Sequence, residues 1–152
     1  MSPLRTFVVA MLVAVAATAV VSAATQRGHF SSVVDTEACF SIVGICTDGT
    51  LTGALKGTFS FTATSLTASA DSAATGVMFY TGDITLTTRD GVLFCKDAGA
   101  FDVNAPGAVS SVCKVTGGTG EFAGASGTIQ FVGTFTFAGG GDGEYRAMIT
   151  VP

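Results

Sequence analysis

The feature that most constrains the fold is a two-residue alternation of apolar and polar side chains. Between residues 55 and 64, Leu, Gly, Phe, Phe and Ala occupy the odd positions, and Lys, Thr and Ser occupy the even positions. The same period returns later in the chain, where Ile129, Phe131 and Phe135 share one parity. Successive side chains of a strand point to opposite faces, so these segments predict strands with one apolar and one polar face. No stretch has the spacing of an amphipathic helix, and an all-β chain is predicted.

Turn signals separate the alternating segments. The strongest are Asp48-Gly49, Asp90-Gly91, Pro106-Gly107 and the glycine-rich run 139–143. The segments between them predict about eight strands, near residues 29–35, 38–45, 51–64, 74–88, 91–103, 107–116, 126–138 and 143–151. Frequent strands with short polar turns favour an antiparallel barrel or sandwich, and closure into a barrel removes exposed edges.

The N-terminal residues have a different character from the rest. Arg5 gives a positive start, residues 7–21 form an apolar run with one threonine, and small residues follow, ending in Ala23 and Ala24. This is the pattern of a secretory signal peptide, so we predict cleavage after Ala24, with Ala23 as the second choice. A retained anchor helix is the alternative, but the run is at the short limit for crossing a bilayer. Cleavage would leave 25–152 as a single barrel domain, secreted or periplasmic, without a membrane attachment.

The charge of the chain bears on its partners. There are 7 Lys and Arg residues against 11 Asp and Glu residues, a net charge of −4, and loss of Arg5 would make it −5. The basic residues are scattered along the sequence. Binding to nucleic acid requires clustered Lys and Arg to neutralise phosphates, so we expect no nucleic-acid partner.

Four cysteines follow the predicted cleavage point: Cys39, Cys46, Cys95 and Cys113. An even number in an exported chain predicts two disulfides. Of the three possible pairings, proximity in the sequence favours Cys39–Cys46 with Cys95–Cys113. A zinc site would be the alternative, but no Cys-x-x-Cys pair is present and only His29 could assist, so we expect no metal.

The segment from Thr116 to Gly127 is the most distinctive in composition. Its Gly-x-Gly-x-x-Ala spacing loosely matches a dinucleotide-binding loop, but such a loop must open a helix, whereas the residues that follow have the pattern of a strand. We interpret the segment as a tight connection in which glycines permit positive φ and Phe122 folds inward as an apolar anchor.

The same segment carries a family resemblance. TGGTGEFAGASGTIQFVGTF resembles the glycine-rich stretch near the C-terminal end of dirigent proteins and of the related allene oxide cyclase-like barrels, and GDITLTTRDGVLFCKDAGAFD is similar to the strand–turn–strand that precedes it in bacterial secreted members. The resemblance covers about residues 76 to 137. It implies an eight-stranded antiparallel, calycin-like barrel with a central apolar cavity, often trimeric, and an activity that needs no cofactor.

Candidate site residues are few. Asp83 and Arg89 share one strand face, and they would be acid/base and anion-holding groups if that face lined a cavity. The alternative is an ordinary solvated face, which we favour because charged side chains usually stay in water. Tyr80, Tyr145 and Arg146 are candidates for a ligand-binding barrel mouth.

The remaining ionisable residues indicate no site. Asp97 and Asp102 have opposite parity in the predicted strand 91–103, so they do not form an obvious carboxylate pair. His29 stands near the mature N-terminus without a nucleophile to assist. We interpret Glu121, inside the glycine-rich segment, as an exposed turn residue.

Three functions are compatible with these observations. The favoured one is an exported barrel that binds a small apolar ligand without catalysis or cofactor, since barrels of about eight strands can hold one small ligand. The second is a cofactor-free cyclase or a stereo-directing protein of the dirigent type. The third is a structural or surface-interaction protein with a filled barrel.

Overall fold

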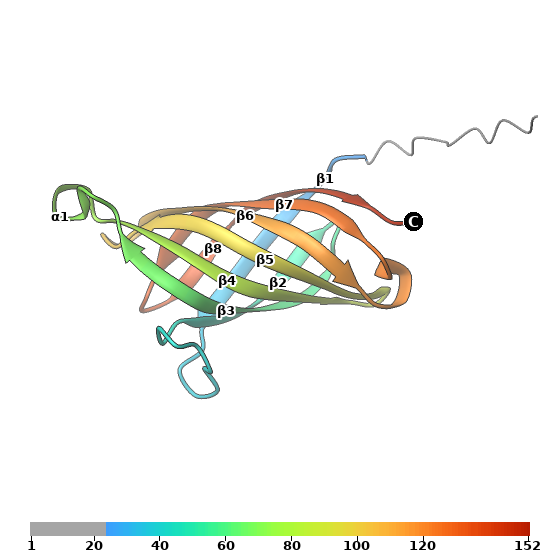
Figure 1. The fold of residues 1–152 in the computed structure, drawn as a ribbon, viewed down its shortest axis with the longest axis horizontal. Coiled ribbons are helices and arrows are strands. Elements are labelled where there is room, and N and C mark those ends of the chain that lie inside the picture. The colour runs from blue at the N-terminus through green and yellow to red at the C-terminus, as the bar shows by residue number, and fades with distance from the viewer. Residues whose placement is uncertain (1–23) are drawn as a thin grey trace, which may run out of the picture.

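The structure is a computed structural model that describes residues 24–152. The predicted signal peptide lies outside the described residues except for its last residue. Eight antiparallel strands form a closed barrel, in which each strand pairs with the next and the last pairs with the first. The prediction of an all-β, eight-stranded antiparallel barrel is confirmed. Figure 1 shows the barrel from the side, with the short helix α1 at one end and the C-terminus near the other.

In chain order the elements are β1 (Gln26–Val34), β2 (Cys46–Gly53), β3 (Gly57–Ala68), α1 (Ser72–Thr75), β4 (Val77–Thr88), β5 (Gly91–Asp102), β6 (Gly107–Gly118), the 3-10 turn η1 (Gly120–Phe122), β7 (Ser126–Thr136) and β8 (Gly140–Thr150). The predicted hairpin at Arg89-Asp90 joins β4 to β5, and the predicted turn before Gly107 joins β5 to β6. Both connections are short, as antiparallel neighbours allow.

The second and third strands lie elsewhere than predicted. Residues 38–45, predicted as a strand, form an irregular loop, and the predicted turn at Asp48-Gly49 lies inside β2. Glycine is required in that strand because a phenylalanine ring of β3 covers it, and a Cβ on Gly49 would lie 2.5 Å from the ring. The turn falls instead at residues 54–56, so the predicted strand 51–64 is divided in two.

Two further boundaries are corrected. Residues 74–76, predicted to open the fourth strand, belong to α1 and its end, where Gly76 adopts a φ of 70°. The run 139–143, predicted as a turn, continues into β8 from Gly140. Gly143 lies in the barrel wall for a packing reason, since a Cβ there would lie 2.8 Å from the ring of Phe30.

The glycine-rich segment connects β6 to β7. Gly120 and Gly124 adopt φ angles of 61° and 73°, which favour glycine. Phe122 packs against the buried core, as predicted for its anchoring role. A strand follows the segment, so the helix that a dinucleotide-binding loop requires is not formed here.

One half of the barrel interior, towards the C-terminus in Figure 1, is filled by side chains. Its members are apolar apart from the hydroxyl of Tyr145, and each is at most 8% exposed: Leu51, Leu55, Leu86, Leu93, Val115, Ala125, Ile129, Tyr145, Ala147 and Ile149. The hydroxyl of Tyr145 accepts a hydrogen bond from the Leu55 N–H at 2.7 Å and can donate to the carbonyl oxygens of Thr52 at 3.0 Å and Leu55 at 3.2 Å. Tyr145 therefore holds the turn between β2 and β3 against this end of the barrel.

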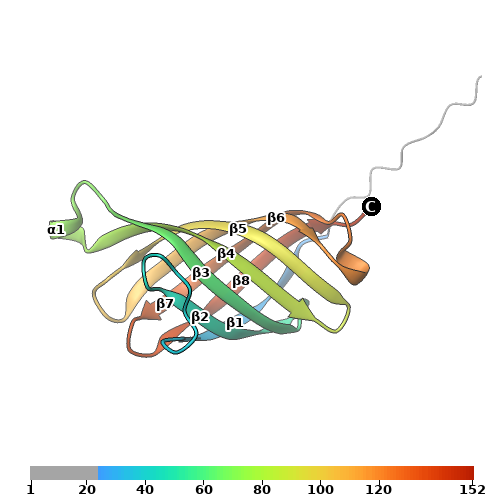
Figure 2. The same cartoon turned by 60° about the horizontal axis from the view of Figure 1, so that its bottom comes forward.

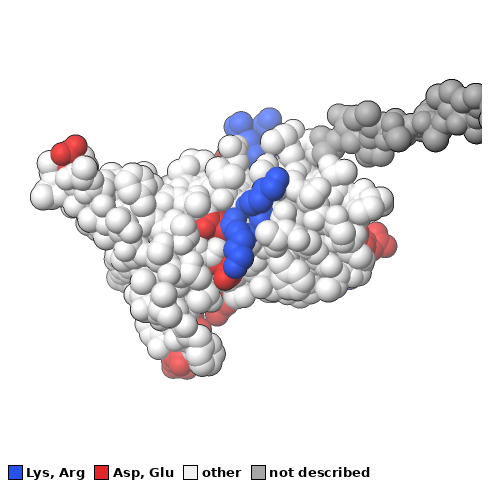
Figure 3. All heavy atoms as spheres, in the orientation of Figure 1, with Lys and Arg blue, Asp and Glu red and all other residues white. Residues whose placement is uncertain are grey.

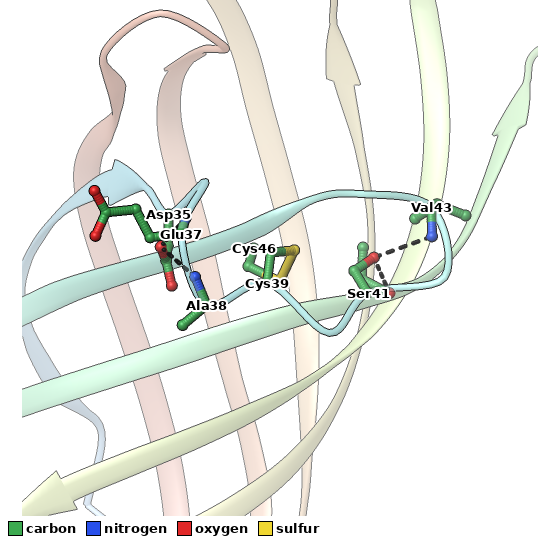
Figure 4. The surroundings of a disulfide bond; sticks show 8 residues. Asp35, Glu37, Ala38, Cys39, Ser41, Val43 and Cys46 are labelled. Carbon is green, nitrogen blue, oxygen red and sulfur yellow. Dashed lines mark hydrogen bonds between the residues drawn. A yellow bond between two sulfur atoms is a disulfide. The ribbon is translucent and has the colours of Figure 1, made fainter.

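Two disulfides fix the barrel at different depths. Cys95 and Cys113 join β5 to β6 within the buried core, and their α-carbons are 5.5 Å apart. Cys39 and Cys46 hold the loop between β1 and β2, which Figure 4 shows. In that loop the Ser41 hydroxyl donates to the Ala63 carbonyl oxygen and accepts from the Val43 N–H. The pairing favoured from the sequence is the one formed, and two disulfides fit an oxidising environment.

Removing the Cys95–Cys113 disulfide should cost more stability than removing the other one. Its 18-residue separation predicts a loss of about 3 kcal/mol in the chain-entropy model. The Cys39–Cys46 bond closes a shorter loop, so about 2 kcal/mol is expected. Denaturant unfolding of the two double Cys→Ala variants measures the difference, and an equal or reversed order would contradict the structure.

Candidate functional site

The other half of the barrel interior, on the α1 side, contains a cavity of about 90 Å³. Its lining comes from all eight strands and from the end of the β1–β2 loop: Phe30, Ser32, Ile45, Thr47, Phe59, Phe61, Ala63, Tyr80, Ile84, Asp97, Phe101, Val109, Ser111, Phe131, Phe135 and Gly141. Phe61, Tyr80, Val109 and Phe135 are only half-buried, which places the mouth of the cavity at this end. Figure 2 shows the β1–β2 loop on the outside of the wall, beside β3.

Aromatic rings form most of the wall. Phe61, Tyr80, Phe101 and Phe135 follow one another with ring centroids 5.5 to 6.0 Å apart. Phe131, 5.5 Å from the ring of Phe30 and 6.4 Å from that of Phe59, lies towards the packed half. Edge-to-face and tilted contacts of this kind hold rings in fixed positions, so the cavity is bounded by packed side chains.

The polar side of the cavity is formed by Asp97 on β5, Tyr80 on β4 and Ser111 on β6. Asp97 is 4% exposed, and its Oδ1 has no hydrogen-bond partner. Gly99 makes room for the other two side chains, because a Cβ there would lie 2.7 Å from the Tyr80 hydroxyl and 2.6 Å from the Ser111 Cβ. A buried carboxyl is thus placed beside two hydroxyls in an otherwise largely apolar chamber.

Burial determines the protonation of this group. Loss of hydration raises the pKa of Asp97 from 3.8 to about 6, although the neighbouring Ser111 and Tyr80 hydroxyls and the Ala98 N–H act in the opposite direction. Burial also raises the pKa of Tyr80, and the negative charge of Asp97 adds to that shift. The Tyr80 hydroxyl therefore stays protonated at neutral pH, whereas Asp97 is largely ionised.

The candidate acid/base residues lie away from the cavity. Asp83 is on the outer face of β4, half-exposed, and forms an ion pair with Lys96 of β5. Arg89 is exposed in the β4–β5 turn and pairs with Asp90. Both side chains are on the solvated side of the wall.

The three residues predicted to frame a ligand-binding barrel mouth lie in three different places. Tyr80 lines the cavity, Tyr145 is buried in the packed half, and Arg146 is exposed on the outer face of β8. Burial raises the pKa of Tyr145, partly offset by its hydrogen bond with Leu55. Tyr145 is therefore placed as a structural residue, and Tyr80 as the member of the set that faces a ligand space.

Sequence reasoning missed Asp97 and Ser111 as site residues. The signal was present in the parity of strand 91–103: Asp97 alternates in phase with Leu93, Cys95 and Phe101, so it is the one charged residue on an apolar face. Asp102, which has the opposite parity, lies outside the cavity. Its carboxylate accepts hydrogen bonds from the backbone N–H and the side-chain amide of Asn104 at the turn. A single charged residue on an otherwise apolar strand face is a stronger indication of a functional site than a pair of carboxylates close in sequence.

The outer surface carries few charges. Lys96 and Lys114 face each other on β5 and β6 and are exposed. Figure 3 shows basic side chains gathered across the middle of one face, with acidic ones beside them and mostly uncharged atoms around.

Within residues 24–152, no group of three or more His, Cys, Asp or Glu side chains could hold a metal ion. Over the same residues, no helix has the length and apolar character needed to cross a bilayer.

In comparisons with known proteins, the chain matches no family model, no curated protein and no solved structure. Fold and site together define a closed, disulfide-linked eight-stranded barrel that is packed at one end and hollow at the other.

Proposed function

We propose that this protein is an exported barrel of the dirigent and allene oxide cyclase-like kind that binds one small, largely apolar ligand without catalysing a reaction. The observation that carries the proposal is the cavity in the α1-side half of the barrel, walled by aromatic rings and bounded by a packed core. Ligand sites are typically concave and mainly apolar, with a few placed polar groups. The polar groups here are Asp97, Tyr80 and Ser111.

The volume limits the ligand to the size of one ring. An engineered apolar cavity of ~150 Å³ holds benzene. At about 90 Å³, this cavity is smaller, so we expect it to take no more than a single ring that extends towards the open end, and it has no room for a long-chain lipid.

Export is supported by the two disulfides and by the signal-peptide pattern of the N-terminal residues. Assignment to the secreted or periplasmic space is part of the proposal. So are the resemblance to dirigent-type barrels and the trimeric assembly that it implies.

Ethylbenzene is expected to raise the melting temperature of the protein in a concentration-dependent way, because a ligand that binds only the folded state stabilises it. Val109→Phe, which places a ring in the cavity, should abolish the rise. The matched control is Val112→Phe on the outer face of the same strand, which should keep it. Equal responses from both variants, or no response in the parent protein, would contradict the proposal.

Cofactor-free catalysis is the second candidate, and the raised pKa of Asp97 is the observation in its favour. A carboxyl that titrates near neutral pH inside an apolar cavity is suited to proton transfer. Incubation with a phenol and an oxidase, followed by measurement of product handedness, tests the dirigent form. Racemic product at stoichiometric protein would exclude it. The filled-barrel alternative has less support, since the cavity leaves part of the interior open.

A further inference from the structure

The charge inside the cavity is of one sign only. Among the described residues that line it, Asp97 and Tyr80 are the ionisable ones, and none is Lys, Arg or His. The elements on either side of Asp97 contribute Tyr80 from β4 and Ser111 from β6, and neither brings a positive charge. A ligand with a carboxylate would therefore place two like charges together in an apolar chamber, which is strongly unfavourable.

The hydrogen-bonding capacity of the carboxyl is incompletely used. Oδ1 of Asp97 has no partner, although buried polar groups nearly always have one. The last torsion of an aspartate side chain is soft and roughly two-fold, so rotation about it can turn the unpartnered oxygen towards a ligand. Together with the hydroxyl oxygens of Tyr80 and Ser111, three side chains on this wall can accept hydrogen bonds.

Aromatic rings form most of the remaining wall, and the face of an aromatic ring attracts a cation in a dehydrated site. We propose that the cavity selects a protonated primary amine on a ring-sized apolar body, with the ammonium group against Asp97, Tyr80 and Ser111 and the ring among Phe61, Phe101 and Phe135. An ammonium has three donors, which matches the number of accepting side chains. This inference rests on the proposed ligand-binding function and specifies its ligand class.

Four probes of similar size test the selection: benzylamine, benzyl alcohol, ethylbenzene and benzoate, each titrated into the protein by calorimetry at neutral pH. Benzylamine is expected to bind about tenfold or more tightly than ethylbenzene, because a charge-assisted hydrogen bond is added to ring burial. Benzoate is expected not to bind. The advantage of benzylamine over ethylbenzene should disappear as the pH falls through the titration of Asp97, and the affinity for ethylbenzene should stay constant.

Asp97→Asn provides the second arm. It should remove the preference, so that the variant binds benzylamine no more tightly than ethylbenzene. Equal binding of benzylamine and ethylbenzene by the parent protein, or tightest binding of benzyl alcohol or benzoate, would overturn the amine preference and leave the proposed function standing. Failure of all four probes to bind would overturn the proposed function itself.

Discussion

Asp97→Asn is expected to make the protein more stable at neutral pH. The difference in unfolding free energy between the variant and the parent protein should grow by about 3 kcal/mol, in favour of the variant, as the pH rises from about 3.5 to about 8. The reason is the cost of keeping a dehydrated carboxylate in the cavity wall, where it is 4% exposed. Asparagine occupies nearly the same volume without a charge.

The sign follows from the direction of the shift. Below pH 3.8 the Asp97 carboxyl is protonated in both the folded and unfolded states, and above about pH 6 it is ionised in both. Between these limits the folded state holds the proton more tightly, so the stability contributed by Asp97 is present at low pH and is lost as the pH rises through its folded pKa. Other carboxyl groups titrate in both proteins and cancel in the difference.

Urea unfolding of both proteins across this pH range measures the effect. Asp83→Asn is the matched control, since Asp83 is half-exposed on the outer wall beside Lys96 and should give no comparable gain. A stability difference between Asp97→Asn and the parent that does not change with pH would show that the carboxyl is not buried in the folded state.

Tyr145→Phe is expected to destabilise the protein by about 3 kcal/mol, although it removes a single oxygen atom. The hydroxyl is the acceptor for the buried Leu55 N–H and lies within hydrogen-bond distance of two carbonyl oxygens at the closed end of the barrel. Phenylalanine fills the space and leaves these backbone groups without the partner. A buried donor left unpaired costs its full desolvation energy.

The control is Tyr80→Phe, whose hydroxyl faces the cavity. Measured at about pH 4, where Asp97 is protonated, Tyr80→Phe should cost about 1 kcal/mol or less. Thermal or denaturant unfolding compares the two variants. Equal losses would contradict the division of the barrel into a packed end and a hollow end.

Alternation and turn chemistry predicted frequent strands in a barrel or sandwich, because these signals act locally and repeat along the chain, and the choice of an eight-stranded barrel rested on the removal of exposed edges and on the resemblance to dirigent-type barrels. The hairpin at Arg89-Asp90 and the Cys95–Cys113 pair follow from these short-range patterns. The failure at 38–45 has a physical reason: the segment has strand-like residues, but it is tethered by Cys39–Cys46 outside the wall, and its short apolar run carries no information about which neighbour it pairs with. The turn predicted at Asp48-Gly49 is wrong because Gly49 lies inside a strand, where the absence of a side chain leaves room for the ring of Phe59.

The candidate site is harder to predict from the sequence than the fold. Parity can place Asp97 on the inner face of β5, but it cannot say that Tyr80 and Ser111 flank it, since that depends on the register of three strands. Nor can it say which half of the barrel is filled. The packed half is filled mainly by aliphatic side chains, whereas the hollow half is lined mainly by aromatic rings together with small residues such as Ser32, Ser111 and Gly141.

The central claim is that the α1-side half of the barrel is a binding chamber for a ring-sized molecule. Chemical-shift mapping by NMR during titration with ethylbenzene tests it most directly. The expected result is that perturbations concentrate on Ile84, Val109 and Phe135 around the cavity, while Leu93 and Ile149 in the packed half remain unchanged. Saturable perturbations confined to the outer wall, or none at all, would contradict it.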